Sequence, residues 1–146
     1  MNHRRIAESL VRKYHTRDPF RIAHDRGYIV IRTPLKGIRG FWKYIRRQHL
    51  IFVDSGLSEW EARFVCAHEI GHILMHRGEN RIFAYTHTYF QISRQEQEAD
   101  RFALDLLYDD ADLRFFLDYP IQLAADHMGV SVELAEYRLR QLTHSQ

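Results

Sequence analysis

The sequence lacks the features that mark membrane, disulfide-bonded or disordered proteins. Its 146 residues include a single cysteine, Cys66, so an intramolecular disulfide is impossible. Its longest apolar run is far shorter than the roughly 20 residues that a membrane-spanning helix needs. The first 15 residues contain no continuous apolar segment, so we expect no signal peptide. Internal repeats, low-complexity tracts and linkers are also missing. Together these absences predict a cytoplasmic protein that does not enter a membrane.

The composition is that of a soluble globular protein, but the charge is unevenly distributed. Apolar residues make up 45% and charged residues 27% of the chain, which is ordinary for one domain of this length. Residues 1–50 hold 13 Lys and Arg against 3 Asp and Glu, a balance of +10, whereas residues 51–146 have a balance of −8. Either the first half presents a basic face to an acidic partner or nucleic acid, or the two halves fold together and neutralise each other. The second interpretation is favoured, because no aromatic-rich basic surface typical of nucleic-acid binding is evident.

Hydrophobic periodicity and capping signals predict an α+β fold. Three segments rich in branched and aromatic residues predict a small antiparallel sheet, with a turn around Arg47 and Gln48: YIVIRTP, GFWKYIR and HLIFVDSG. Residues 79–92 are expected to form a strand or an ordered loop. Helices are expected over residues 4–15, from Pro19 towards Gly27, from Ser58 to about His76, from Ser93 to about Tyr108, and on both sides of Gly129. We predict a single compact domain over residues 1–146, with its C-terminal helical segment, about 120–142, packed on the rest.

The segment VCAHEIGHILMHRG, residues 65–78, contains the pattern H-E-x-x-H within an otherwise apolar helix. Residues four apart lie on one face of a helix, so His68 and His72 can present their imidazoles to one cation. A catalytic zinc site has three protein ligands and an open position for water, whose pKa the metal lowers to about 7. Glu69 lies beside the two histidines and can take the proton of that water. The pattern therefore predicts two zinc ligands and a general base, although such sites also accept manganese and other divalent ions.

A structural explanation competes with the catalytic one, because so short a pattern also occurs by chance. In that case the histidines are satisfied core or surface groups. The apolar surroundings weigh against it, since burying His and Glu is costly without a compensating partner. Gly71 is a second clue, because glycine costs about 1 kcal/mol relative to alanine inside a helix. A close neighbour over this face of the helix, or packing against a strand, would explain it.

A third ligand is expected downstream, in SRQEQEADRFALDLL, where two glutamates compete. With Glu96 set at 0° on a helical wheel, the apolar residues fall between about 280° and 20°, and Glu98 falls at about 200°. Glu96 therefore lies in the inward-facing arc, whereas Glu98 is better explained as a solvated surface charge. Asp100, at about 40°, can accept a hydrogen bond from the free ring nitrogen of a ligand histidine. Glu96 is the favoured third ligand, with Glu98 as the alternative.

The remaining polar and aromatic residues near the motif have less direct interpretations. His76 follows His72 by four residues, but three histidines on successive helical turns converge poorly on one ion. We interpret it as a helix-end residue that interacts with the last carbonyl groups. His87, Tyr85 and Tyr89 are candidates for stabilising an oxyanion, although aromatic packing or a surface loop explains them equally. Cys66 is interpreted as a small buried apolar residue.

With these segments located, AHEIGHILMH followed by EQEADRFALDLL resembles the ImmA/IrrE family of zinc metallopeptidases, an H-E-x-x-H, gluzincin-like family. Its pattern E-x-x-x-[ND]-x-F-A-x-x-L-L is matched from Glu96 through Asp100 to Leu107. Tyr108 and Asp109 stand where members often have Met-Pro, which affects the end of that helix and not the ligands. The resemblance implies that His68, His72 and Glu96 bind zinc and that Glu69 is the general base.

The resemblance also implies an intracellular endopeptidase of narrow specificity whose substrate is a helix-turn-helix repressor of a phage or mobile element. Two alternatives remain. The segment QLAADHMGVSVELAEYRLRQL has the layout of a helix-turn-helix, but its strongly basic residues, Arg138 and Arg140, lie near the end of its second helix, so direct nucleic-acid binding is disfavoured. A pseudo-enzyme that binds a repressor without cleaving it is the other alternative, and the presence of Glu69 argues against it.

Overall fold

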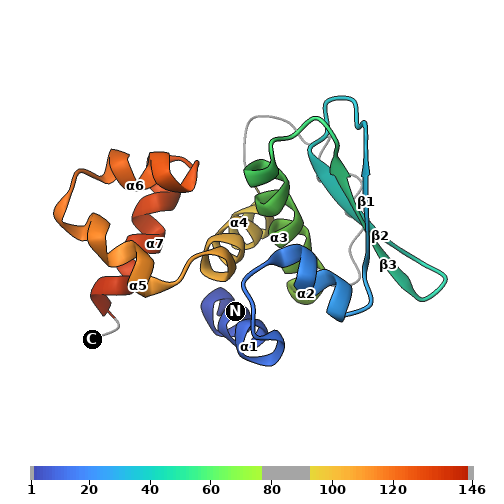
Figure 1. Cartoon of the computed structure of the whole chain (residues 1–146), viewed down its shortest axis with the longest axis horizontal. Coiled ribbons are helices and arrows are strands. Elements are labelled where there is room, and N and C mark those ends of the chain that lie inside the picture. Colours follow the sequence, from blue (N-terminus) through green and yellow to red (C-terminus); the bar gives the residue numbers. More distant parts are fainter. Residues whose placement is uncertain (1, 77–92, 145–146) are drawn as a thin grey trace. The chain divides into compact units, whose positions relative to one another are not determined.

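The computed structural model describes residues 2–76 and 93–144. The expected strand or loop over residues 79–92, with His87, Tyr85 and Tyr89, lies outside the described residues. The chain divides into two compact units, Met1–Leu107 and Tyr108–Gln146 (Figure 1). The α+β class is confirmed. The single domain over residues 1–146, with its C-terminal helical segment of about 120–142 packed on the rest, stays a prediction.

The first unit is built from four helices and one sheet within its described residues. The helix that begins at Pro19 starts where the sequence indicates: the Asp18 side chain accepts a hydrogen bond from the backbone N–H of Phe20, and Pro19 occupies the first turn. The elements are α1 (His3–Tyr14), α2 (Pro19–Asp25), β1 (Ile29–Thr33), β2 (Gly40–Ile45), β3 (Gln48–Asp54), α3 (Glu59–Met75) and α4 (Arg94–Leu107).

The sheet is mixed, so the prediction of an antiparallel sheet was wrong in one pairing. The strand order is β1-β3-β2: β2 and β3 pair antiparallel, whereas β1 and β3 pair parallel. Consecutive strands usually pair with each other, but residues 34–39 carry the chain past one strand position, and β3 fills it. Asp54, at the end of β3, holds this connection: its carboxylate accepts from the Leu35 N–H at 3.0 Å and its N–H donates to the Arg39 carbonyl at 2.9 Å.

The turn between β2 and β3 consists of Arg46 and Arg47, one residue earlier than expected. Their φ angles are 52° and 64°. Two successive left-handed residues make a turn of type I′, which matches the twist of an antiparallel hairpin. Glycine and asparagine usually occupy these positions, which explains why the sequence placed the turn imprecisely.

The helix α3 is the centre of the first unit and is buried on nearly every side. It contacts β2, β3, α2 and α4 (Figure 1), which explains why it lacks the polar face of a surface helix. The expected capping box is confirmed: Ser58 Oγ accepts from the Glu61 N–H at 3.1 Å, and the Glu61 carboxylate accepts from the Ser58 N–H at 3.0 Å. Cys66 is fully buried within α3, as expected, and burial raises the pKa of its thiol.

Gly71 sets how closely α3 and α4 approach each other. A Cβ atom at this position would lie 2.8 Å from Cδ1 of Phe102, a fully buried residue of α4. The close neighbour anticipated for this glycine is therefore a helix. Arg17 fixes α4 at its other end, where its Nη1 donates to the carbonyls of Asp105 and Leu106 at 3.1 Å each.

The second unit is helical throughout its described residues. It contains α5 (Asp110–Leu113), the 3₁₀ helix η2 (Arg114–Asp118), α6 (Ile121–Met128) and α7 (Val132–His144). Gly129, with φ 69°, ends α6 in the left-handed conformation that favours glycine. Arg138 of α7 is 1% exposed, and its Nη2 lies 2.8 Å from both the Tyr108 carbonyl and the Asp110 carboxylate.

None of the helices in residues 2–76 and 93–144 combines the length and the apolar character needed to cross a membrane.

Candidate metal centre

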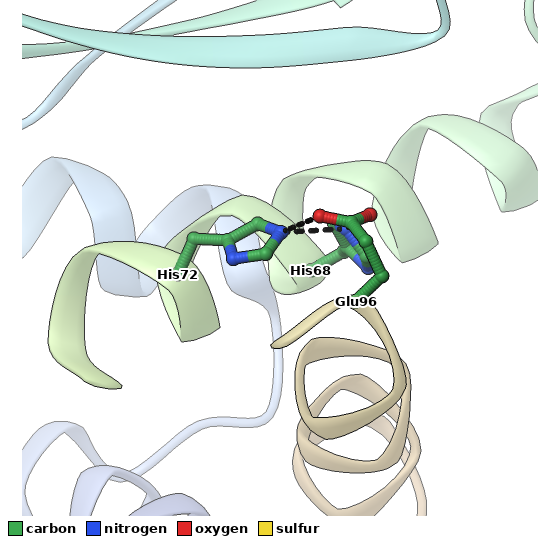
Figure 2. A group of neighbouring side chains, drawn as sticks. All are labelled: His68, His72 and Glu96. Carbon is green, nitrogen blue, oxygen red and sulfur yellow. Dashed lines mark hydrogen bonds and ion pairs between the residues drawn. The ribbon is translucent and has the colours of Figure 1, made fainter. Parts of the chain in front are cut away.

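The two histidines of the H-E-x-x-H pattern face the same point, as their spacing on α3 requires. Nε2 of His68 lies 3.1 Å from Nε2 of His72. His72 is fully buried and His68 is 8% exposed. Both rings therefore turn the same nitrogen toward one small region between α3 and α4 (Figure 2).

Glu96 reaches this region from the first turn of α4. Its carboxylate oxygens lie 3.0 Å from Nε2 of His68 and 2.5 Å from Nε2 of His72. Ser93 fixes the start of α4, since its hydroxyl accepts a hydrogen bond from the Glu96 N–H at 3.1 Å. Among the described residues, His68, His72 and Glu96 form the group of ligand atoms that could hold a metal ion, all within 4.8 Å of one another (Figure 2).

The donor set fits a tetrahedral zinc ion, and two of its three separations approach the spacing that such an ion requires. With zinc–ligand distances of about 2.1 Å, two ligand atoms of a tetrahedral site lie about 3.4 Å apart. The separations of 3.1 and 3.0 Å approach this value, and the 2.5 Å contact of Glu96 with His72 is shorter, as in a direct hydrogen bond. Two neutral imidazoles and a carboxylate are also typical ligands of catalytic zinc. Three ligands leave the fourth position of a tetrahedron for water or substrate.

Glu69 is the buried carboxylate of the site and is 0% exposed. It follows His68 directly on α3, and its negative charge is one of the influences that raise the pKa of His68. A buried carboxylate next to one of the candidate ligands is of the type that accepts a proton from a reacting water.

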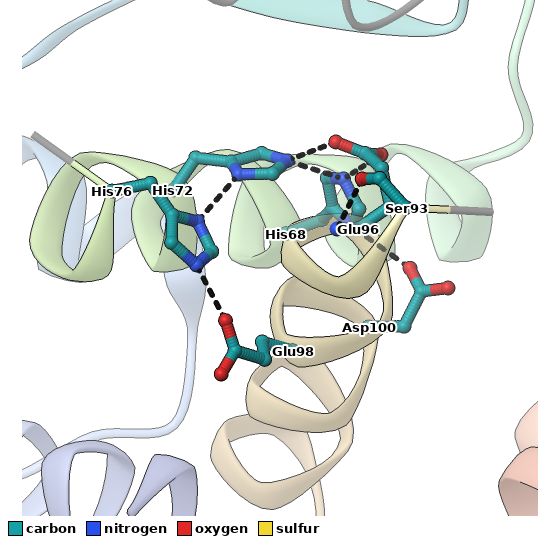
Figure 3. Close-up of polar contacts among 7 residues, drawn as sticks. All are labelled: His68, His72, His76, Ser93, Glu96, Glu98 and Asp100. Atoms are coloured by element: carbon teal, nitrogen blue, oxygen red, sulfur yellow. Dashed lines mark hydrogen bonds and ion pairs between the residues drawn. The ribbon is translucent and has the colours of Figure 1, made fainter. Parts of the chain in front are cut away.

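Asp100 holds the other side of His68. Its Oδ1 lies 2.8 Å from Nδ1 of His68, the ring nitrogen that faces away from the cluster (Figure 3). A carboxylate only accepts hydrogen bonds, so Nδ1 carries the hydrogen and the lone pair of Nε2 can face a metal. Asp100 lies one helical turn after Glu96, which brings both carboxylates to the same imidazole.

His76 and Glu98 do not occupy the places expected from the sequence. The backbone N–H of His76 ends α3 by donating to the His72 carbonyl at 2.8 Å, but its ring does not lie against the last carbonyls. The ring is buried, with Nδ1 2.9 Å from Nδ1 of His72 and Nε2 2.9 Å from Glu98 (Figure 3). Glu98 is therefore not a solvated surface charge: its side chain is 19% exposed and is paired with this histidine.

Helical periodicity missed this contact because it assigns each residue to a face of its own helix only. The i, i+4 spacing of His72 and His76 could have indicated that their rings are in contact. That spacing does not say how far α4 is offset along α3, and this offset decides whether Glu98 reaches His76.

The carboxylates and imidazoles of the cluster shift one another's pKa values. Burial alone would lower the pKa of His68, but hydrogen bonds with Asp100 and Glu96 outweigh it and raise that pKa to about 10. Burial alone would raise the pKa of Glu96, but hydrogen bonds with His68 and His72 hold it well below its usual value. Without a metal, the cluster is thus stabilised by an imidazolium–carboxylate pair.

Comparisons with known proteins show the family of the chain. The model of the Peptidase_M78 family, described as the IrrE N-terminal-like domain, matches residues 23–140. "Uncharacterized immunity region protein 2" of Bacillus phage phi105 is 34% identical over 134 residues, which cover 90% of this chain and 85% of that protein. "Metallopeptidase ImmA" of Bacillus subtilis strain 168 is 24% identical over 142 residues, which cover 92% of this chain and 82% of that protein. The chain therefore belongs to the ImmA/IrrE family of metallopeptidases, the family that its two motifs indicated.

Proposed function

We propose that the protein is a zinc-dependent endopeptidase of narrow specificity. The observation that carries the proposal is the convergence of His68, His72 and Glu96 from two helices, with the fully buried Glu69 next to His68 on α3. In the proposal the first three residues hold the metal and Glu69 is the general base. Asp100 orients His68 through the 2.8 Å contact with Nδ1.

The proposed role of each residue follows from the chemistry of its side chain. A zinc ion in this site would supply Lewis-acid activation of water and of the scissile carbonyl. Glu69 would accept the proton of the attacking water and then deliver it to the leaving amine, because that amine is a stronger base than a carboxylate. His68 and His72 bind through Nε2, which requires each to keep its remaining proton on Nδ1.

The proposed substrate is a helix-turn-helix repressor of a phage or mobile element. The motif resemblance suggests such a substrate, and the relative from phage phi105 is named after an immunity region. A protease of such a region would be expected to act on a protein of the same region. The peptide that enters the site and the bond that is cut would then belong to one partner and not to proteins in general.

Direct DNA binding is the weaker alternative. A helix that reads bases must present cationic or amide side chains to the groove. In α7, Arg138 is 1% exposed and engaged with Tyr108 and Asp110. Arg140 is then the one exposed arginine of this helix, which is too little for the phosphate contacts of a DNA-binding helix.

Cleavage of a repressor tests the proposal directly. The wild-type chain and Glu69→Gln are each co-expressed with the helix-turn-helix repressor of the genetic element that encodes the protease, and the repressor is analysed by intact mass spectrometry. We expect one defined cut with the wild type and at least a thousandfold slower cleavage with Glu69→Gln, because oriented general-base catalysis is lost. Near wild-type cleavage by Glu69→Gln would rule out the assigned role.

Metal content tests the ligand set separately. Purified wild-type protein should hold one zinc per chain by elemental analysis, and Glu69→Gln should hold the same amount. His72→Ala and Glu96→Ala should lose it, because two remaining ligands bind zinc weakly. Glu98→Ala tests the alternative ligand and should still hold one zinc at saturating metal, because His68, His72 and Glu96 remain. Glu59→Ala, whose carboxylate pairs with Arg32 on the exposed first turn of α3, is the matched control. Loss in Glu98→Ala with retention in Glu96→Ala would reverse the assignment.

A further inference from the structure

The buried ring of His76 connects His72 to a carboxylate on the neighbouring helix. It is in contact at both nitrogens, 2.9 Å from Nδ1 of His72 and 2.9 Å from Oε1 of Glu98 (Figure 3). His76 is not a member of the group of ligand atoms that could hold a metal. We propose that His76 and Glu98 are positioning residues, which fix the tautomer and the ring orientation of His72. This inference rests on the proposed role of His72 as a metal ligand.

Only one placement of the ring hydrogens on His72 and His76 is compatible with metal binding by His72. A carboxylate only accepts, so Nε2 of His76 carries a hydrogen and donates it to Glu98. A neutral His76 then has its lone pair on Nδ1 and accepts the hydrogen on Nδ1 of His72. This leaves the lone pair of His72 on Nε2, the atom that faces His68 and Glu96. The opposite tautomer of His72 would point a hydrogen at the metal.

The two candidate ligand histidines are thereby held in parallel ways. Nδ1 of His68 contacts the carboxylate of Asp100 directly, whereas Nδ1 of His72 reaches the carboxylate of Glu98 through His76. Both carboxylates come from α4. Hydrogen bonds of this kind from a metal-bound histidine orient the ring and raise its basicity.

Burial makes this relay costly to break. His72 is fully buried and the side chain of His76 is 5% exposed, so water cannot easily replace a lost partner. Glu98 is in addition approached by His3 of α1, whose Nε2 lies 4.0 Å from the second carboxylate oxygen. The alternative to a positioning role is a purely structural one, in which the contact between His76 and Glu98 only joins α3 to α4.

Zinc affinity distinguishes a positioning role from a structural one. We would titrate the metal-free, full-length chain with zinc against a chromophoric chelator at constant pH. His76→Leu removes the acceptor for His72 and should weaken zinc binding about 10- to 100-fold. His76→Asn can place its amide oxygen near the former Nδ1 and should recover most of the affinity, although its link to Glu98 is lost.

Glu98→Gln probes the far end of the relay with little change in shape. Its amide oxygen still accepts from His76 but carries no charge, so we expect a smaller loss of zinc affinity than in His76→Leu. Glu59→Gln is the matched control, because it removes one carboxylate from the exposed first turn of α3, where it pairs with Arg32. It should bind zinc as the wild type does. The double variant of His76→Leu and Glu98→Gln should be no weaker than His76→Leu alone, since members of one relay are not additive.

The possible failures have different meanings. If the wild-type chain does not bind one equivalent of zinc, the proposed function itself is wrong. If the wild type binds zinc and both His76→Leu and Glu98→Gln stay within about twofold of it, the positioning role is wrong. Circular dichroism monitors the fold of each variant. Should His76→Leu not fold, Glu98→Gln decides: an affinity equal to that of Glu59→Gln overturns the inference, and a lower affinity supports it.

Discussion

His68 is the residue on which proton binding and metal binding compete most directly. Its Nε2 faces Glu96 and His72, and its pKa is raised to about 10 by its carboxylate partners against the opposing effect of burial. At neutral pH the His68 ring of the metal-free protein therefore carries a hydrogen on both nitrogens, including Nε2. A metal ion can bind through Nε2 only after that proton has left.

We predict that zinc binding releases protons near pH 7. Because the folded pKa of His68 lies above its ordinary value of 6.5, the stability that the proton gives the metal-free protein is complete below about pH 6.5 and is lost as the pH rises through about 10. Zinc affinity changes in the opposite sense and rises across the same window. Isothermal titration calorimetry in two buffers of different ionisation enthalpy counts the protons. Zinc binding without proton release at pH 7 would contradict the raised pKa.

Single residues were predictable from the sequence where one helix decides their position. His68, His72 and Glu96 follow from spacing and periodicity within α3 and α4. The contact of His76 with Glu98 depends on how two helices are offset along each other, which no property of either helix alone contains. Periodicity therefore gave Glu98 a solvent-facing position, although its side chain is 19% exposed.

At the level of elements, the spacing between α3 and α4 controls whether the three candidate ligands can meet. Gly71 of α3 faces Phe102 of α4 within the contact between these two helices. A side chain at Gly71 has no room, because the carbon it adds would lie 2.8 Å from the Phe102 ring. Close packing here is thus a condition for the site.

We predict that Gly71→Ala destabilises the protein and weakens zinc binding together. Alanine favours the helix by about 1 kcal/mol, but overpacking against Phe102 costs about 1–3 kcal/mol and pushes α4 away from the histidines. Urea unfolding of the metal-free protein and a zinc titration measure the two effects. Gly56→Ala is the control, because its new carbon would meet Asp54 at an ordinary 3.4 Å. Unchanged zinc affinity in Gly71→Ala would show that the site tolerates a shift of α4.

The elements themselves were largely predictable, whereas their pairing in the sheet was not. Alternating branched and aromatic residues marked all three strands, and the Ser58–Glu61 capping box marked the start of α3. Strand order depends on the path of residues 34–39, which Asp54 fixes from the end of β3. The hydrogen bond from the Leu35 N–H to Asp54 joins residues 19 positions apart, so the local sequence pattern does not predict it.

On the scale of the molecule, the first unit combines residues from both charged halves of the sequence. Arg17 caps the end of α4, and Arg32 pairs with Glu59 through two contacts of 3.1 Å. These contacts agree with the interpretation that the basic and acidic halves neutralise each other in part. The candidate ligands likewise come from elements on both sides of residues 77–92.

We predict that zinc stabilises the folded protein by an amount set by its affinity. A ligand that binds only the folded state adds about 2.7 kcal/mol when its free concentration is 100 times Kd. The melting temperature should therefore rise with zinc and fall to the metal-free value when a chelator is added. Differential scanning calorimetry provides the measurement, and His72→Ala should melt at the same temperature with and without zinc. An equal rise in His72→Ala would place the bound metal elsewhere.

The arrangement of α4 also has a consequence for how the protein is made. This helix supplies Glu96, the partner of His68 and the carboxylate behind His76, all within residues 96–100. Both histidines precede this stretch in the sequence, so the ribosome adds them first. With the proposed ligand set, a chain that ends before α4 would offer a metal ion His68 and His72 without Glu96. Peptidase activity would then require that the first unit be synthesised and folded through its last helix.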